Sequence, residues 1–497
     1  MEMSRDAVVV VVGAGAMGGG IAQVAALAGH VVRVIDPSAA ALDRARNTIS
    51  ASLAALTKRG THSTSETNAA LARLTFTKET SSASGATLVI EAIVEQLAAK
   101  LQLFEVMSRV VGPDAILASN TSSLSIADLA NATPGPHRVL GLHFFNPAPI
   151  MRLVEIVPGP VTPVATIDAM IALMRTWAKH PVVVRDVPGF IVNRVARPYY
   201  AEGFAALGEG IAPERIDAAL TSSGGFRLGP LALADLIGHD VNYAVACSIF
   251  DAYGGQTRFR PQSTQRTLFE EGRLGRKTGS GVYDYAAAMP SATVEVDGPE
   301  PRKIQVSSCP GRFLGLATVA REAGLPLTVD HDLGDERLRV GNEVIAFGDG
   351  RRLRDRPGVS GLMDTPRDPS DWMTWVASAA SPSARAVIAG LAGALGRTVL
   401  FVPDRPGQIV LRTLAQLANS AGDAVQDGVA SEEGIDDAMV HGANHPQGPL
   451  AWARRHGLDR VARTLNNIAD ATGEDFYRPS PWFREARLTP RRAGGVR

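Results

Sequence analysis

The sequence predicts an α/β protein that begins with a doubly wound, mostly parallel sheet, continues as an all-helical domain, and then repeats this plan in altered form. Three observations predict it. Strand-length apolar runs alternate with helical stretches up to residue 185, helix-period apolar positions fill residues 186–290, and part of the second segment recurs after residue 403.

Length and composition limit the possible classes of protein. A chain of 497 residues predicts three or four domains. Lys+Arg 50 against Asp+Glu 50 disfavours a binder of nucleic acid or anionic lipid, and two cysteines exclude a disulfide scaffold. The first apolar run is too short to span a membrane. We expect a soluble, cytoplasmic protein with no metal centre.

The first element is a βαβ unit. Ala7–Val12 is β-branched without alternation, as in a strand buried on both faces. A glycine-rich turn follows, then the helical run Ile21–Ala28, and a second apolar strand, Val31–Ile35, ends on Asp36. Further strands of the same sheet are predicted at Leu88–Glu91, Ala115–Ala118, Val139–His143, Leu153–Val157 and Val182–Val184.

Changes of composition divide the rest of the chain. Pro188-Gly189 marks the entry to the helical domain, and a polar, proline-rich stretch before residue 304 has the composition of a linker. The predicted segments are 1–185 (sheet), 186–290 (helical), 291–303 (linker), 304–403 (small degenerate α/β unit), 404–487 (second helical copy) and 488–497 (basic tail).

Self-comparison supports the second copy. Asp186-Val-Pro-Gly-Phe-Ile-Val-Asn-Arg194 recurs as Asp404-Arg-Pro-Gly-Gln-Ile-Val-Leu-Arg412. With one inserted residue, Asp217, Gly229-Pro-Leu231, Gly238 and Asp240 recur as Asp436, Gly448-Pro-Leu450, Gly457 and Asp459. The second α/β unit has no glycine-rich turn, so we assign it no second cofactor.

A dinucleotide site is predicted at the first turn. Gly13, Gly15 and Gly18 have the G-x-G-x-x-G spacing, which on its own is also found in simple tight turns. Here the glycine motif follows a strand and begins a helix, and Asp36 stands at the end of the next strand. The carboxylate of Asp36 can accept hydrogen bonds from ribose hydroxyls and repel a 2′-phosphate. The pattern favours a Rossmann-type domain that binds NAD.

Four polar clusters follow predicted strands: Glu91-Ala-Ile-Val-Glu95 with Lys100, Ser119-Asn-Thr-Ser-Ser123, His143-Phe-Phe-Asn-Pro147, and Glu155. Taken singly, a Ser/Asn run is often a cap or turn, and a lone histidine is often structural. However, a chain that leaves one strand at His143 and returns along the next can place Glu155 beside it. Such a dyad suits removal of a proton from a secondary alcohol.

These motifs resemble those of the L-3-hydroxyacyl-CoA dehydrogenase family. The resemblance covers the first 285 residues and includes Gly13–Ala22, Ser119–Ser123, Gly141–Pro147, Pro188–Arg194 and Gly275–Tyr283. The longer layout, with its second copy, looks like the bacterial branch that oxidises 3-hydroxyadipyl-CoA or 3-hydroxybutyryl-CoA, notably in phenylacetate breakdown.

The resemblance implies a role for each matching position. His143 would be the general base, Glu155 its orienting partner, and Ser122 and Asn193 the groups that hydrogen-bond the reacting end of the substrate. Contacts to coenzyme A would fall on Ser52 and Arg59, although Arg59 also fits a solvated cation at a helix end. Cofactor contacts would fall on Gly13, Gly15, Met17, Gly18, Asp36, Glu95, Lys100, Ser122, Asn146 and Lys277.

Departures from the family pattern indicate one active site per chain. Asn193 becomes Leu411 in the second copy, and no counterpart of His143 or Glu155 was found before it. Because single-copy members pair their helical domains across a homodimer, we expect residues 404–485 to pack on 186–290 as an intrachain pseudo-dimer, with further homo-oligomers possible. The alternatives are a dehydrogenase of a free 3-hydroxy or sugar acid, and a non-catalytic NAD-binding relative.

Overall fold

The computed structural model describes residues 7–368 and 373–488, which form two compact units. One unit comprises Met1–Arg194 with Asp427–Ala443, and the other comprises Val195–Gln426 with Asn444–Arg497. A piece of the second helical copy thus belongs to the first unit. Most of the predicted basic tail, 488–497, lies outside the described residues. None of the helices in the described ranges is long and apolar enough to cross a membrane.

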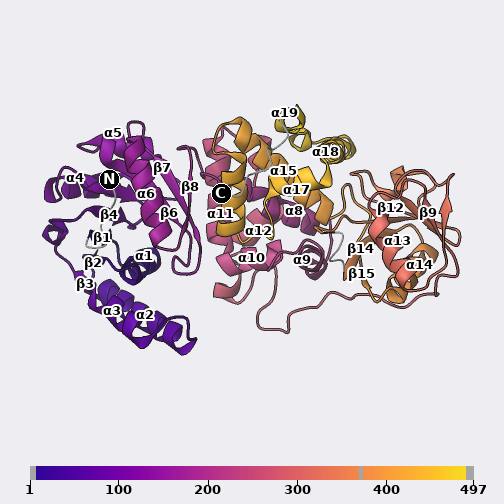
Figure 1. The fold of residues 1–497 in the computed structure, drawn as a ribbon, viewed down its shortest axis with the longest axis horizontal. Helices are drawn as coiled ribbons and strands as arrows, with labels where there is room; N and C mark the ends of the chain where they lie inside the picture. The colour runs from indigo at the N-terminus through magenta and orange to yellow at the C-terminus, as the bar shows by residue number, and fades with distance from the viewer. Residues whose placement is uncertain (1–6, 369–372, 489–497) are drawn as a thin grey trace. The chain divides into compact units, whose positions relative to one another are not determined.

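The first unit contains an eight-stranded sheet in the order β3-β2-β1-β4-β5-β6-β7-β8 (Figure 1). Neighbouring strands are parallel except β6 and β7, which are antiparallel. The strands are β1 (Val8–Val12), β2 (Val31–Ile35), β3 (Leu74–Thr77), β4 (Leu88–Glu91), β5 (Ile116–Ser119), β6 (Val139–Phe144), β7 (Leu153–Pro158) and β8 (His180–Val183).

Helices connect these strands, and their apolar faces cover the sheet. Val9 and Val11 of β1 belong to a core that also includes Ile21 and Val24 of α1. The helices are α1 (Ala16–Leu27), α2 (Ala39–Lys58), α3 (Thr64–Ala72), α4 (Leu97–Val110), α5 (Ile126–Asn131) and α6 (Val164–Thr176), with short 3-10 turns η1 (Thr80–Ala83) and η2 (Pro136–Arg138).

The predicted strands of this sheet are confirmed, with two differences. Helix α1 begins at Ala16 rather than near Ile21, because the glycines of the turn form its first turns despite their low helix propensity. Strand β3 was not predicted, since Leu-Thr-Phe-Thr is short and only half-buried and so carries little hydrophobic signal.

The first helical copy follows α7 (Val192–Val195). Its elements are α8 (Arg197–Gly208), α9 (Pro213–Ser222), α10 (Pro230–Ile237), α11 (His239–Ala252), η3 (Thr257–Phe259), α12 (Ser263–Glu270) and η4 (Arg276–Thr278). Residues 291–303 then contain no helix or strand, yet they are anchored to the second α/β unit. Glu295 exchanges backbone hydrogen bonds with Val399 at 2.8 Å, and its carboxylate pairs with Arg385.

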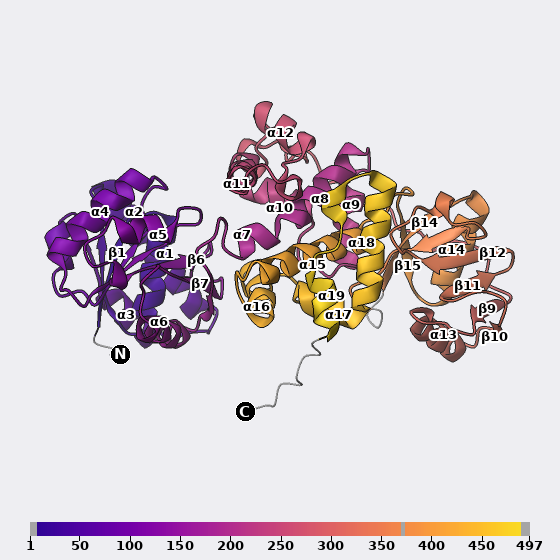
Figure 2. The same ribbon diagram turned by 90° about the horizontal axis from the view of Figure 1, so that it is seen from above.

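The second α/β unit has a seven-stranded mixed sheet in the order β10-β9-β11-β12-β13-β14-β15, with α14 packed on it (Figure 2). Strands β9 and β10 with α13 repeat the βαβ arrangement of β1, α1 and β2. The elements are β9 (Ile304–Ser307), α13 (Phe313–Glu322), β10 (Leu327–Asp330), β11 (Arg337–Val340), β12 (Glu343–Phe347), η5 (Leu353–Asp355), β13 (Gly361–Met363), β14 (Thr374–Ala379), α14 (Pro382–Ala394) and β15 (Thr398–Phe401).

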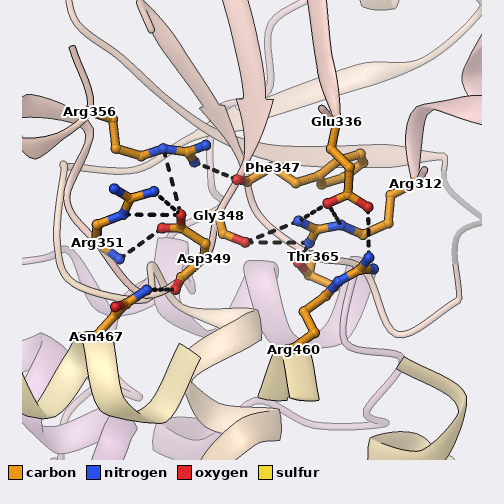
Figure 3. Close-up of polar contacts among 10 residues, drawn as sticks. All are labelled: Arg312, Glu336, Phe347, Gly348, Asp349, Arg351, Arg356, Thr365, Arg460 and Asn467. Atoms are coloured by element: carbon orange, nitrogen blue, oxygen red, sulfur yellow. Dashed lines mark hydrogen bonds and ion pairs between the residues drawn. The ribbon is translucent and has the colours of Figure 1, made fainter. Parts of the chain in front are cut away.

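Figure 3 shows a network of charged side chains that includes Arg312, which lies in the loop after β9, where the first sheet has its glycine-rich turn. Arg312, with 9% of its side chain exposed, pairs with Glu336 at 3.1 Å, and Glu336 also binds Arg460 of α18 at 2.8 Å. Nearby, Asn467 of α18 donates to the carbonyl of Asp349 at 2.7 Å. This network holds the second sheet against the second helical copy.

The second helical copy repeats the helix order of the first. Its elements are α15 (Val410–Gln426), α16 (Glu432–Gly442), α17 (Pro449–His456), α18 (Leu458–Thr472), η6 (Asp475–Tyr477) and α19 (Trp482–Leu488). Gly238 and Gly457 end equivalent helices with φ of 100° and 102°, a left-handed region in which a Cβ would be strained. The predicted duplication is therefore present at the level of individual turns.

Candidate active site

The carboxyl ends of β1, β4, β5 and β6 meet at one edge of the first sheet, because these strands are adjacent and parallel. The glycine-rich turn follows β1, the Glu95 loop follows β4, the Ser122 loop follows β5, and His143 lies near the end of β6. In open α/β sheets ligands bind outside this edge. Three of the four predicted clusters therefore come together here with the nucleotide turn.

The glycine-rich turn is shaped for close approach to an anion. A Cβ on Gly13, where φ is 107°, would lie 2.4 Å from the carbonyl oxygen of Ala92, and one on Gly18 would lie 1.8 Å from that of Gly13. Gly15 has nothing within 4 Å of such an atom and stands at the N-cap of α1. The open space over Gly15 fits a pyrophosphate held by helix amides, as NAD requires.

Asp36 directly follows β2, beside this turn. Its Oδ2 accepts a hydrogen bond from the amide of Ala14 and its Oδ1 one from the amide of Ser38, both at 2.8 Å. The carboxylate is thereby fixed next to the nucleotide turn. Met17 lies in the first turn of α1 and packs against the core.

A buried ion pair supports the β4 edge. Lys100 Nζ donates to Glu91 Oε1 at 2.6 Å, and Ser119 Oγ donates to Glu91 Oε2 at 2.6 Å. Lys100 and Glu91 have 1% and 0% of their side chains exposed. Because each oxygen of Glu91 accepts a hydrogen bond, its desolvated charge is compensated, and the ends of β4 and β5 are held in a fixed relation to helix α4.

Glu95 shapes the loop that contains Ser122. It accepts hydrogen bonds from Thr121 Oγ1 at 2.5 Å and from the amide of Ser122 at 3.0 Å, and it pairs with Lys100 at 3.1 Å. Burial acts to raise the pKa of Glu95, but these hydrogen bonds and the charge of Lys100 outweigh it and lower the pKa below its usual value. Glu95 is therefore a carboxylate that positions Ser122.

His143 and Glu155 form the predicted dyad. They are directly opposite in the β6–β7 register, and His143 Nδ1 lies 2.6 Å from Glu155 Oε2. Glu155 is fully buried, and its Oε1 accepts hydrogen bonds from the amides of Ile191 at 3.0 Å and Val192 at 3.1 Å. A carboxylate at Nδ1 favours the tautomer that leaves the Nε2 lone pair to accept a proton.

Two asparagines adjoin the dyad. Asn193 follows directly on Ile191 and Val192, whose amides bind Glu155, and it lies with Val192 in the short helix α7. The sequence predicts no separate role for Asn120, yet its Oδ1 accepts a hydrogen bond from the amide of Phe144 at 2.8 Å. It ties the Ser122 loop to the strand that carries His143. Its place between Ser119 and Thr121 after a buried strand was the only signal for it.

A cavity of about 750 Å³ lies beside the glycine turn, between α1, α2 and the loop after β6. Its lining includes Gly15 and Asn146 of the predicted cofactor contacts and Ser52 and Arg59 of the predicted coenzyme A contacts. His143, Glu155 and Ser122 are not among its lining residues. The cavity thus adjoins the nucleotide turn rather than the dyad.

Three cations that line this cavity, Arg44, Arg152 and Lys179, were not predicted from the sequence. Arg44 lines it from α2, two helical turns before Ser52. Lys179 also lines it and donates to the carbonyls of Ala148 at 2.5 Å and Met151 at 2.8 Å, which fixes the loop after β6. Burial, and then the charge of Arg152, lower the pKa of Lys179 to about 8. The spacing of Arg44 and Ser52 on one face of the helix could have identified Arg44 from the sequence. No local sequence pattern identified Lys179.

Lys277 is in the second unit, in η4, where it forms an ion pair with Asp240. The amide of Asn242, two residues further along α11, donates to the carbonyl of Gly238 at 2.9 Å. The other predicted site residues, namely Gly13, Gly15, Met17, Gly18, Asp36, Ser52, Arg59, Glu95, Lys100, Ser122, His143, Asn146, Glu155 and Asn193, all belong to the first unit.

The second sheet has counterparts of the dyad that the sequence did not reveal. The repeat aligns Leu400 with Val182, and these residues pair with Val376 and Glu155 respectively. The amide of Asp364 in turn donates to the carbonyl of Val376 at 2.7 Å, so Asp364 stands where His143 stands in the first sheet. A carboxylate replaces the histidine, and an apolar side chain replaces the glutamate.

Asp364 takes over the structural task of Glu155. It is fully buried and accepts hydrogen bonds from the amides of Ile409, Val410 and Leu411 at 2.7–2.9 Å, which repeat Ile191, Val192 and Asn193. The contact between a buried carboxylate and the amides at the start of the following helix is kept, but the histidine is missing. The second copy therefore has a buried carboxylate at this position, but no imidazole that could accept a proton from a substrate.

Comparison with known proteins agrees with this geometry. The family model for the 3-hydroxyacyl-CoA dehydrogenase NAD-binding domain matches residues 8–187. The model for the C-terminal domain of the same family matches twice, at 189–285 and 407–492, which confirms the duplicated helical domain.

Relatives match over the whole chain and over its first half. A protein of Escherichia coli K12 named 3-hydroxyadipyl-CoA dehydrogenase is 40% identical over 97% of both chains. A probable 3-hydroxybutyryl-CoA dehydrogenase of Bacillus subtilis is 39% identical over 56% of this chain and 96% of its own. A solved structure from Escherichia coli K12, named 3-hydroxybutyryl-CoA dehydrogenase, matches with a TM-score of 0.86 and 38% identity over 97% of this chain and 98% of that one.

The two family models, the full-length likeness and the edge geometry agree with one another. The chain belongs to the 3-hydroxyacyl-CoA dehydrogenase family and is an NAD-dependent oxidoreductase.

Proposed function

We propose that this enzyme oxidises (S)-3-hydroxyacyl-CoA thioesters, with 3-hydroxyadipyl-CoA or 3-hydroxybutyryl-CoA as its substrate. The observation that carries the proposal is the buried His143–Glu155 pair, whose Nδ1 and Oε2 atoms are 2.6 Å apart at the sheet edge that holds the nucleotide turn. The names of the full-length relatives support the two acyl groups.

In this reaction His143 Nε2 removes the proton from the 3-hydroxyl group. NAD, when bound, accepts the hydride that leaves C3, and the product is the 3-oxoacyl thioester. Glu155 stabilises the imidazolium that forms, and because two backbone amides hold its other oxygen it cannot turn away from the ring. Ser122 and Asn193 would donate hydrogen bonds to the substrate oxygen as it becomes a carbonyl.

Residues Ser52 and Arg59 would hold the coenzyme A portion. Both line the cavity beside the nucleotide turn, and Arg44 and Lys179 add positive charge to the same wall. Coenzyme A carries phosphates, and arginine binds phosphate in a bidentate manner. A few local cations therefore suffice in a chain whose formal net charge is +0.

The test is an assay of NADH formation with both thioesters at matched concentrations. A ratio of kcat/KM above about tenfold, or about 1.4 kcal/mol of differential transition-state binding, would assign one acyl group. Turnover of free 3-hydroxy acids without turnover of either thioester would contradict the proposal.

The two helical copies, we infer, imitate a homodimer within one chain. Reciprocal contacts support this: Arg194 pairs with Asp427, the first residue after α15, and Arg412 lies 3.9 Å from Glu209, the first residue after α8. A two-fold interface has such reciprocity, in which residue i contacts j and j contacts i.

The reciprocal contacts between the two copies also involve the last strand of each sheet. Val429, just before α16, accepts a hydrogen bond from the amide of Arg185 after β8 at 2.9 Å, while Arg215 of α9 donates to the carbonyl of Phe401 in β15 at 2.8 Å. Each helical copy therefore packs against the last strand of the other copy's sheet. We propose the boundaries 1–185, 186–290, 304–403 and 404–487 as the ancestral domains.

A further inference from the structure

Three potential metal ligands meet where α16 packs on β8. His180, at the start of β8, places Nε2 2.9 Å from Asp437 Oδ2, and His441 follows Asp437 by one helical turn on α16. The ring centroids of the two histidines are 4.3 Å apart. The ligand atoms all lie within 4.8 Å of one another, and the chain separates His180 from Asp437 by 257 residues.

Packing alone does not require these residue types. The internal repeat offers a position for comparison, because α9 corresponds to α16 and reaches β15, the counterpart of β8, through the hydrogen bond from Arg215 to the carbonyl of Phe401. There the aligned residues are Thr398, Ala218 and Ser222. The aligned positions thus hold two imidazoles and a carboxylate in one copy and no imidazole or carboxylate in the other.

We infer that His180, Asp437 and His441 bind a divalent transition metal, with Zn²⁺ as the favoured ion, and that the ion fastens α16 to β8. Two imidazole nitrogens and one carboxylate oxygen are a ligand set that Zn²⁺ takes, with water in the fourth position. Hard ions such as Mg²⁺ and Ca²⁺ prefer oxygen ligands and fit this set less well.

The geometry needs only a small adjustment. Bonds of about 2.0–2.1 Å in a tetrahedron separate the ligand atoms by roughly 3.3 Å, against 4.8 Å or less here. The side chains of His180 and Asp437 are 33% and 48% exposed, so solvent reaches the site and the side chains can turn. The charge of Arg152 acts on His441 and opposes a cation.

The experiment uses the full chain without a histidine tag, first treated with a chelator. Zn²⁺ is titrated calorimetrically and by thermal unfolding, and Co²⁺ is used as a spectroscopic probe. We expect one ion per chain, a rise in Tm, and the visible absorption of Co²⁺ held by nitrogen and oxygen ligands. His441→Ala and Asp437→Asn should each weaken binding by more than about tenfold, while Arg152→Gln should strengthen it.

The control is His331→Ala, which removes an exposed histidine from the second unit and should leave Zn²⁺ binding unchanged. Near-equal Tm values of the metal-free proteins will show that the variants fold. The inference is overturned if the chain shows no saturable binding, or if His441→Ala and Asp437→Asn bind Zn²⁺ as tightly as the original chain. Binding that is lost only with His143→Ala would place the ion at the dyad and would equally overturn it.

Discussion

At the scale of single residues, the proposed mechanism depends on carboxylates whose oxygens all have hydrogen-bond partners. Glu155 accepts from two backbone amides with one oxygen and lies 2.6 Å from His143 with the other, and Glu91 is satisfied in the same way by Lys100 and Ser119. A buried charge with a complete set of hydrogen bonds has one orientation. In the proposed mechanism the proton acceptor is therefore oriented before the substrate arrives.

Replacement of His143 by Gln tests the base. The side chain stays polar but cannot take a proton, so kcat should fall by about 10²–10⁴-fold while the Kd for NAD stays unchanged. Steady-state NADH formation and a fluorescence titration of NADH measure the two quantities. His137→Gln, which changes a histidine of η2, should turn over normally. Near-normal turnover of the His143 variant would refute the assignment.

Replacement of Asp36 by Ala tests the cofactor preference. The carboxylate beside the nucleotide turn should accept ribose hydroxyls and repel a 2′-phosphate, so its loss should reduce the ratio of kcat/KM for NAD over NADP by more than about tenfold. The exposed Asp43 on α2, changed to Ala, is the matched control. An unaltered ratio would remove Asp36 from the site.

At the scale of elements, equivalent strands and helices of the two copies carry different side chains. We expect this difference to decide which copy is active. Helix α2 presents Arg44, Ser52 and Arg59 to the cavity, and β6 and β7 place the dyad in register. The corresponding strands β13 and β14 keep the antiparallel pairing but present Asp364 and Val376. The frame is conserved between the copies, and the chemistry is not.

Helix α2 can be tested through Arg59. If its guanidinium binds a phosphate of coenzyme A, Arg59→Ala should raise KM for the acyl-CoA about tenfold, with little change in kcat or in KM for NAD. Lys58→Ala removes an exposed cation at the adjacent position and should have no such effect. If Arg59→Ala leaves KM for the thioester unchanged, the residue is a solvated helix-end cation.

Asp364 can be tested through stability. Its replacement by Ala leaves the amides of Ile409, Val410 and Leu411 without an acceptor in the core, which should cost roughly 2 kcal/mol or more. Urea unfolding would report the loss, and kcat per folded molecule should not change. Asp335→Ala, at an exposed site of the same α/β unit, should be close to neutral. A large loss of kcat would give the second copy a catalytic role.

At the scale of the whole molecule, we propose that the first half of the chain carries the active site and that the second half supplies contacts. Relatives such as the Bacillus subtilis protein match only 56% of this chain but 96% of their own length. Here α16 packs within the first unit, and α8 meets α15 through Glu202 and Arg412, whose Oε2 and Nε atoms are 2.6 Å apart. The second half thus covers surfaces that a short chain would leave open.

A chain that ends near residue 290 tests this role. It loses α15 and α16, which exposes the face of α8 around Glu202 and the edge at β8. We expect it to dimerise through this face or to aggregate, as measured by light scattering and sedimentation. A stable, active monomer would count against the intrachain pseudo-dimer.

The sequence by itself determined the first sheet, the duplication and the identity of the dyad, because these rest on local signals. The run Val8–Val12, the spacing of Gly13, Gly15 and Gly18, and the repeat around Asp186 and Asp404 are each readable within a few residues. Even the pairing of His143 with Glu155 follows from two strands joined by a short turn.

Only the tertiary structure decided the contacts between distant segments. It brought His180 to Asp437, placed Asp364 in the position of His143, and assigned α16 to the first unit. It also brought the carboxyl ends of β1, β4, β5 and β6 together at one edge of the first sheet. Such contacts depend on long-range packing and register, which no local pattern of side chains encodes.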